Sequence, residues 1–165
     1  ARDITPDKTL TTCTTGNNRV SMNLFFQAFP AEDVTAMERD QSLVDEWVEG
    51  ETRCLLSTDI GTAWDILNRL LAGAGIRSNR FFDDVLSNGC EVVDPALVQG
   101  HAERLSNWTH AQLLDGLRNL SGADELYLLE YFQDEEQELL DEFDKLVAFY
   151  REAAAQGLAV LHYAA

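Results

Sequence analysis

Cysteine is scarce in this sequence, and the close cysteine pairs that bind zinc or exchange disulfides are missing. The three cysteines, Cys13, Cys54 and Cys90, lie far apart, and no Cys-x-x-Cys spacing occurs. This spacing excludes a zinc ribbon and a thioredoxin-like redox motif. Isolated thiols in odd number are typical of a reducing compartment, so we expect a cytoplasmic protein. A disulfide between two of the three cysteines is left open.

Basic residues are also few. Twelve Lys and Arg stand against 29 Asp and Glu, which gives a net charge of −17 and a pI near 4.3. Binding to nucleic acids or to anionic membranes draws on Lys and Arg, so neither partner is expected. No apolar run approaches the roughly 18–20 residues that cross a bilayer. An acidic surface most often serves solubility, and the other interpretation is a basic protein partner.

The motifs that mark common catalytic and cofactor sites are absent. No Gly-x-Ser-x-Gly elbow occurs, and Gly73-Ala74-Gly75 lacks the third glycine and the Lys-Ser/Thr ending of a phosphate cradle. No Glu-x-x-His pair suits a di-metal bundle, and His101-Ala102-Glu103 matches only half of a zinc deaminase signature. We therefore expect no catalytic, metal-binding or cofactor-binding residue, and an enzyme is the least favoured class.

The three histidines suggest no site by their spacing. His101 and His110 fall on different predicted helices, and we expect both at the surface rather than as a metal pair. His162 lies on a predicted terminal strand. A surface position at the strand end is favoured there, and an imidazole facing a pocket is the alternative.

The hydrophobic pattern predicts one domain with a strand near each end. Met22–Phe29 presents two largely apolar faces, which is typical of an internal strand. Leu158–Tyr163 also alternates, and we expect it to join the same sheet. A third short strand is expected at Glu91–Val93. The 165 residues suffice for a core without disulfides.

Capping residues predict the helices between these strands. Pro30 begins a helix over 31–38, and Gly50 ends a second one over 41–48. Asp59 is the predicted N-cap of a helix ending at Ala72, with Gly73 as the left-handed residue after it. Other helices are expected over 81–86, from Pro95 to about Ser106, after the N-cap Thr109, and from the N-cap Asp134, with Gln137 in a capping-box position, to Gly157.

Three of these segments resemble a known family. They are the opening strand Met22–Phe29, the Trp-led helix Ala63–Gly73 with its Leu-Leu-Ala-Gly ending, and Leu146–Ala154 followed by Gly157 and an apolar strand. Together they resemble the small bacterial YfbM-like proteins, a family without an established activity. The resemblance spans Met22 to Tyr163. It implies a mostly helical α+β domain over 20–165, with a small sheet that pairs the N-terminal and C-terminal strands.

Residues 1–19 are expected to lie outside that domain. They are polar and rich in threonine, without a periodic apolar face, so they form either a flexible tail or an extension of the gene model. The second alternative comes from the resemblance, because relatives begin Met-Ser-Met-Asn-Leu where this chain has Val20-Ser21-Met22-Asn23-Leu24.

A ligand pocket is predicted around the Trp-led helix. Asp65 and Asn68 are one helical step apart and direct a carboxylate and an amide into a shared cleft beside Trp64. Tyr127 resembles the tyrosine of a family Glu-Ile-Tyr-Pro element, although leucine replaces the proline. Relatives tend to carry histidines near the positions of Asp65 and Asn68, and their absence from this chain argues against a catalytic imidazole that defines the fold. The alternative is a core tryptophan with ordinary polar residues on the helix surface.

A second predicted site is an acidic helix face. Ten carboxylates and no basic residue occur between Asp124 and Asp144, and Glu135, Glu138 and Glu142 share one face. Three function classes follow from the sequence. The first is a non-catalytic module, of an immunity-like kind, that binds a basic protein through this face. The second is a small-molecule-binding protein, and the third is an enzyme without a recognised motif.

Overall fold

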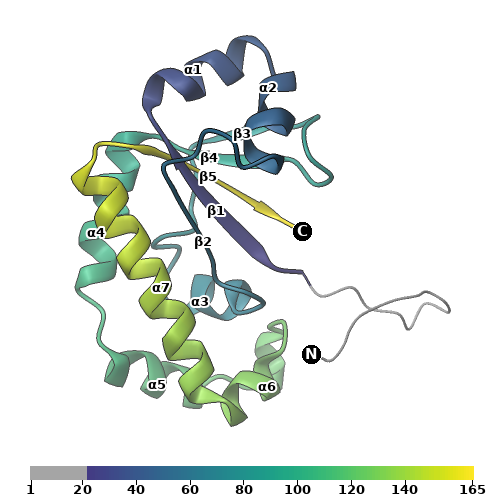
Figure 1. Ribbon diagram of the computed structural model, residues 1–165. Helices are drawn as coiled ribbons and strands as arrows, with labels where there is room; N and C mark the ends of the chain where they lie inside the picture. Colours follow the sequence, from purple (N-terminus) through teal and green to yellow (C-terminus); the bar gives the residue numbers. More distant parts are fainter. Residues whose placement is uncertain (1–21) are drawn as a thin grey trace, which may run out of the picture.

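The structure is a computed structural model that describes residues 22–165, so the predicted tail or extension at 1–19 lies outside the described residues. At its centre is a five-stranded antiparallel sheet in the order β2-β1-β5-β4-β3 (Figure 1). The strands are β1 (Leu24–Phe29), β2 (Leu56–Asp59), β3 (Arg80–Phe82), β4 (Cys90–Val93) and β5 (Ala159–Ala164).

The N-terminal and C-terminal strands pair along their length, as predicted. β1 lies between β2 and β5, in a register that sets Phe26 opposite His162. Because side chains alternate across a strand, Leu24 and Phe26 enter the larger core cluster, whereas Phe29 enters a smaller cluster on the other face. The first strand is therefore internal and covered on both faces.

Helices cover both faces of this sheet, which makes the fold α+β and mostly helical, as predicted. The smaller cluster lies under α1 (Ala31–Arg39), α2 (Ser42–Val44) and a π-helical turn at Asp45–Glu49. The larger cluster lies under α3 (Trp64–Leu70), α4 (Pro95–Ser106), α5 (His110–Arg118), α6 (Leu129–Asp134) and α7 (Glu136–Ala155), with a 3-10 turn at Gly122–Asp124. Within residues 22–165 no helix combines the length and the apolar character that a membrane span requires.

Several predicted helix ends are confirmed. α4 begins at Pro95, and α5 begins after Thr109, whose hydroxyl accepts the Gln112 N–H at 3.1 Å. α7 is the predicted long helix, with Leu139 and Tyr150 among its buried residues, and it ends before Gly157 at a φ of +69°. In each case a capping residue, proline or glycine next to a strong apolar face was enough to predict where the helix begins or ends.

Two predicted helix starts are wrong. Asp59 does not cap α3, because it ends β2 and its Oδ1 accepts the Gly61 N–H at 2.9 Å, while α3 begins at Trp64 without a side-chain cap. The short, half-exposed β2 has no periodicity by which to recognise it. Asp134 does not cap α7 either, because it ends α6, and Gln137 donates to Asp141 at 2.9 Å instead.

The segment predicted as a helix over 81–86 is wrong as well. Its first residues form β3, which pairs with β4 and sets Phe81 opposite Glu91. The ladder to β4 overrides the local preference for a helical turn. The helix predicted over 41–48 does form, but it continues as the π-helical turn and ends at Gly50.

Candidate functional site

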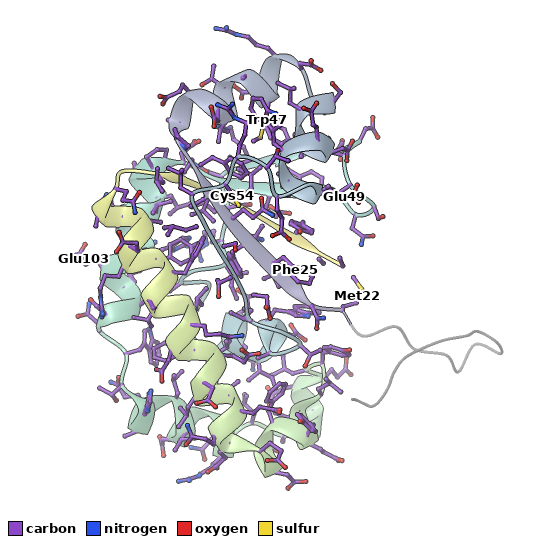
Figure 2. The ribbon with its side chains drawn as sticks, in the orientation of Figure 1. Met22, Phe25, Trp47, Glu49, Cys54 and Glu103 are labelled. Atoms are coloured by element: carbon purple, nitrogen blue, oxygen red, sulfur yellow. The ribbon has the colours of Figure 1, made fainter. Side chains whose placement is uncertain are left out.

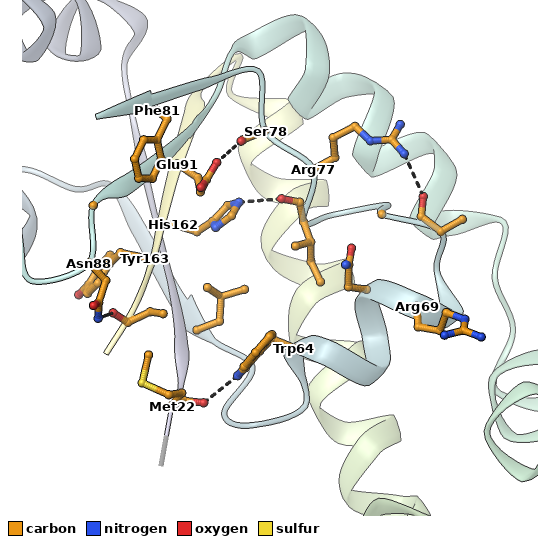
Figure 3. Close-up of a pocket in the computed structure, with 17 residues that line it drawn as sticks. Met22, Trp64, Arg69, Arg77, Ser78, Phe81, Asn88, Glu91, His162 and Tyr163 are labelled. Atoms are coloured by element: carbon orange, nitrogen blue, oxygen red, sulfur yellow. Dashed lines mark hydrogen bonds between the residues drawn. The ribbon is translucent and has the colours of Figure 1, made fainter. Parts of the chain in front are cut away.

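A pocket of about 1060 Å³ opens to solvent between α3, the following loop and one end of the sheet (Figure 3). Helix α3 contributes Trp64 and Asn68, and the loop at residues 73–78 contributes Ile76, Arg77 and Ser78. The sheet contributes Phe81 from β3, Glu91 from β4, and His162 and Tyr163 from β5. Together with Met22 and Leu24 around the start of β1, the lining residues come from four stretches of the chain, 22–24, 64–81, 88–91 and 162–164.

The 73–78 loop passes close over the core before it returns to the sheet. Gly73 and Gly75 have φ values of +87° and +84°, which favour glycine. A Cβ atom at Gly75 would lie 2.9 Å from Cδ2 of Leu146 on α7. The two glycines therefore let the loop turn sharply and bring the next three residues to the pocket.

Two buried histidines hold consecutive carbonyl groups of this loop. The His162 imidazole lies 2.8 Å from the Ile76 carbonyl oxygen, and the His101 imidazole lies 2.7 Å from that of Arg77, each through Nε2. Because a carbonyl only accepts, Nε2 carries the proton in both rings. Their exposures of 3% and 0% correct the expectation that these side chains lie at the surface.

Burial keeps both imidazoles neutral near pH 7. It lowers the pKa of His162 to about 4 and also lowers that of His101. With Nε2 donating, Nδ1 of each ring is an acceptor. In His101 this acceptor faces the Arg104 guanidinium at 3.2 Å, whereas Nδ1 of His162 is buried without a partner among the described residues.

The structure brings the four predicted ligand residues together, in two different positions. Trp64 and Asn68 line the pocket. Behind them the Tyr127 ring stacks on Trp64, with 5.6 Å between the ring centroids. The backbone N–H of Tyr127 donates to Asp65 Oδ2 at 2.9 Å. The Trp64 indole N–H donates to the Met22 carbonyl at 2.8 Å. Asp65 and Tyr127 thus support Trp64 from behind and do not line the pocket.

Several polar groups in the pocket have hydrogen-bonding capacity to spare. The Ser78 hydroxyl donates to Glu91 Oε1, which leaves Oε2 without a partner among residues 22–165. Within the same residues the Asn68 side-chain amide makes no hydrogen bond. The Arg77 guanidinium makes one long bond of 3.5 Å to the Ala72 carbonyl. Of these three side chains the sequence interpretation identified only Asn68.

The predicted acidic face is divided between free and engaged carboxylates. Glu135 is exposed at the start of α7. Glu138 accepts the Tyr131 hydroxyl at 2.6 Å, and this bond raises the pKa of Tyr131 to about 12. Glu142 lies 2.6 Å from Lys145 Nζ, and its side chain is only 17% exposed. Burial raises the pKa of Glu142, so it belongs to the fold as much as to the surface.

Within residues 22–165 Cys54 and Cys90 form no disulfide and neither thiol is activated, while Cys13 lies outside the described residues. Cys54 and Trp47, both labelled in Figure 2, pack against the smaller cluster, and Cys90 is buried in β4. Burial raises the pKa of Cys90 to about 12 and also raises that of Cys54, so both remain protonated thiols. No group of three or more metal-ligating side chains gathers within residues 22–165.

Comparison with known proteins places the fold in a family. A family model described as "Domain of unknown function (DUF1877)" matches residues 20–163. The fold is similar to the crystal structure of YfbM from Escherichia coli, a protein of unknown function. That match has a TM-score of 0.62 and 15% identity, and it covers 87% of this chain and 99% of the other. The resemblance to the YfbM-like proteins is thereby confirmed, and at this identity the structural match shows the fold alone. No curated protein matches the chain by sequence.

Proposed function

This chain belongs to the DUF1877 family of domains of unknown function, so its activity has to be argued from its own site, and we propose that it binds a small organic molecule in the pocket beside α3. The observation that carries the proposal is the set of uncommitted polar groups on Asn68, Arg77 and Glu91 in a pocket whose walls are more apolar than polar. Ligand sites typically combine such walls with a few polar groups that orient the ligand.

The charge of the pocket differs from that of the molecule. The chain carries −17 overall, but two arginines, Arg69 and Arg77, and one carboxylate, Glu91, line this pocket. Arg69 is paired with Asp124 at 2.5 Å, which leaves Arg77 and Glu91 to meet a ligand. A pocket that carries charges of both signs favours specific recognition of a ligand, whereas a uniformly acidic surface would serve only solubility.

A thermal-shift screen over a metabolite panel tests the proposal. A compound at 100 times its Kd stabilises the folded state by about 2.7 kcal/mol, which raises Tm by several degrees. Asn68→Trp fills the pocket from an exposed helix position, and Ala148→Trp makes the same addition on an exposed position of α7. We expect stabilisers of the wild type and of Ala148→Trp to have no effect on Asn68→Trp. A panel without stabilisers, or stabilisers that act equally on Asn68→Trp, would contradict it.

A second candidate function is capture of a basic protein by the acidic segment. It is favoured by the net charge and by ten carboxylates without a basic residue between Asp124 and Asp144. Of the predicted residues, Glu135 and Glu138 carry this proposal, because the cation Lys145 already balances the charge of Glu142, whereas the Tyr131 hydroxyl on Glu138 is neutral. Complementary charge would speed association and make it sensitive to salt.

Affinity capture with variant baits tests this second candidate. The double variant Glu135→Lys/Glu138→Gln removes charge from the face and keeps an acceptor for Tyr131. Glu103→Lys is the control, on α4 and away from the α7 N-terminus (Figure 2). We expect a basic protein that is retained by the wild type and by Glu103→Lys but lost from the double variant. Equal retention by all three baits would rule this surface out.

A further inference from the structure

We propose that the pocket takes an amphoteric small molecule, with an N–H-bearing head at Glu91, an anionic group that reaches Arg77 at the pocket's other side, and an apolar or planar body against the aromatic rings of the pocket. This inference rests on the proposed function, because it names the chemical class of the ligand of the same pocket. Free amino acids with large side chains and nucleoside monophosphates are two sources of that chemistry.

Glu91 defines the end that receives the head. It stands next to His162 across the β4–β5 ladder and opposite Phe81 across β3–β4, and all three residues line the pocket. Ser78 occupies one carboxylate oxygen, and His162 is neutral with its N–H committed to Ile76. No described cation pairs with Glu91, so its second oxygen is an acceptor for an N–H group of the ligand, and charge makes that bond strong.

Arg77 defines the anionic end. The described chain has nine Lys and Arg, and five of them form ion pairs: Arg53, Arg69, Arg80, Arg118 and Lys145. Of the other four, only Arg77 lines the pocket. Its backbone is fixed by the His101 bond to its carbonyl, while its guanidinium is held only by the 3.5 Å bond to Ala72. A guanidinium group with free N–H donors can bind a carboxylate or a phosphate through two parallel hydrogen bonds.

The two charged ends are separated by the loop that carries Ser78, and the aromatic rings of the pocket lie on the Glu91 side of this loop (Figure 3). Figure 3 shows the Arg77 guanidinium directed away from Glu91, across the loop that carries Ser78. No ion pair joins the two side chains among the described residues. Trp64, Phe81 and Tyr163 supply aromatic surface, and Phe81 is 48% exposed although it is apolar. A volume of about 1060 Å³ accommodates a body as large as a nucleotide.

Two sets of probes test both ends with the full chain. The first set is L-tryptophan, tryptamine without the carboxylate, and indole-3-propionic acid without the amine. The second is adenosine 5′-monophosphate, adenosine without the phosphate, and ribose 5-phosphate without the base. In calorimetric titration we expect the complete molecule of at least one set to bind at least tenfold tighter than both of its truncated forms. The set that responds identifies the source of the ligand.

Two conservative variants assign the ends. Glu91→Gln should weaken the complete molecule about tenfold and leave the form without the N–H head unchanged. Arg77→Met, which keeps the stem, should weaken the complete molecule and leave the form without the anion unchanged. Equal affinity of complete and truncated forms, or no binding in either set, overturns the inference. A neutral compound that binds the wild type but not Asn68→Trp would then leave the proposed function standing and defeat only the ligand class.

Discussion

His162 is a buried imidazole that the fold holds in its neutral form. Burial lowers its pKa to about 4, against 6.5 for an exposed histidine. Between these two values the unfolded chain takes up a proton that the folded chain refuses, so the free energy of unfolding falls as the pH falls. The difference corresponds to a loss of up to about 3 kcal/mol from this side chain. Urea denaturation at pH 7, 5.5 and 4.5 measures it.

The control for this prediction is His162→Gln. Its side-chain amide can still donate to the Ile76 carbonyl and has no proton to gain. We expect the variant to lose less stability than the wild type between pH 7 and 4.5. Glu142, whose raised pKa acts in the opposite direction, is common to both proteins and cancels. Parallel pH profiles would show that His162 does not titrate in this way.

Asp65 has a structural role that can be separated from ligand binding. Its carboxylate accepts the Tyr127 N–H at 2.9 Å in a partly buried position. Asp65→Ala leaves this donor without a partner, so we expect a loss of about 1–3 kcal/mol in the free energy of unfolding, measured by urea denaturation. Asp115→Ala, on an exposed position of α5, should change it by less than about 0.5 kcal/mol. Equal effects of the two substitutions would contradict the assigned role.

At the scale of elements, the sequence predicted segments with a long apolar face better than short ones. α7 and α5 were identified from their periodicity, and β1 and β5 from their alternation. Of the three short strands, β4 was predicted at Glu91–Val93, whereas the half-exposed β2 went unrecognised and β3 was assigned to a helix. The conformation of β2 and β3 comes from pairing with β1 and β4, which is a tertiary effect that local propensity does not contain.

The end of α7 gives a direct test of one glycine. Gly157 has a φ of +69°, and no atom lies within 4 Å of the position that an added methyl group would take, so Gly157→Ala adds backbone strain without a clash. We expect a loss of about 1 kcal/mol in the free energy of unfolding, measured by urea denaturation. Gly122→Ala is the matched control, because its surroundings are equally open and its φ is not in the left-handed region. If both substitutions lower the free energy of unfolding equally, the left-handed conformation at Gly157 does not explain the loss.

At the scale of the whole molecule, the candidate site could be predicted only in part. Trp64 and Asn68 share one helix, so their proximity was visible in the sequence. Arg77, Glu91 and His162 are distant in sequence, and the sheet order β1-β5-β4 together with the two glycines of the loop brings them together. Sequence spacing carries no sign of that arrangement. The loop carbonyls held by His101 and His162 likewise appear only in the fold.

The most direct test of binding in this pocket is to titrate the protein with a stabilising compound and to monitor its side-chain N–H signals by NMR. The three tryptophans provide internal controls, because Trp64 lines the pocket whereas Trp47 packs against the smaller cluster and Trp108 against the edge of the larger one. We predict that the Trp64 indole and the Asn68 amide signals shift together with one Kd, while those of Trp47 and Trp108 stay unchanged. Shifts confined to the α7 N-terminus, or a Trp64 signal that stays unchanged at saturation, would contradict binding in this pocket.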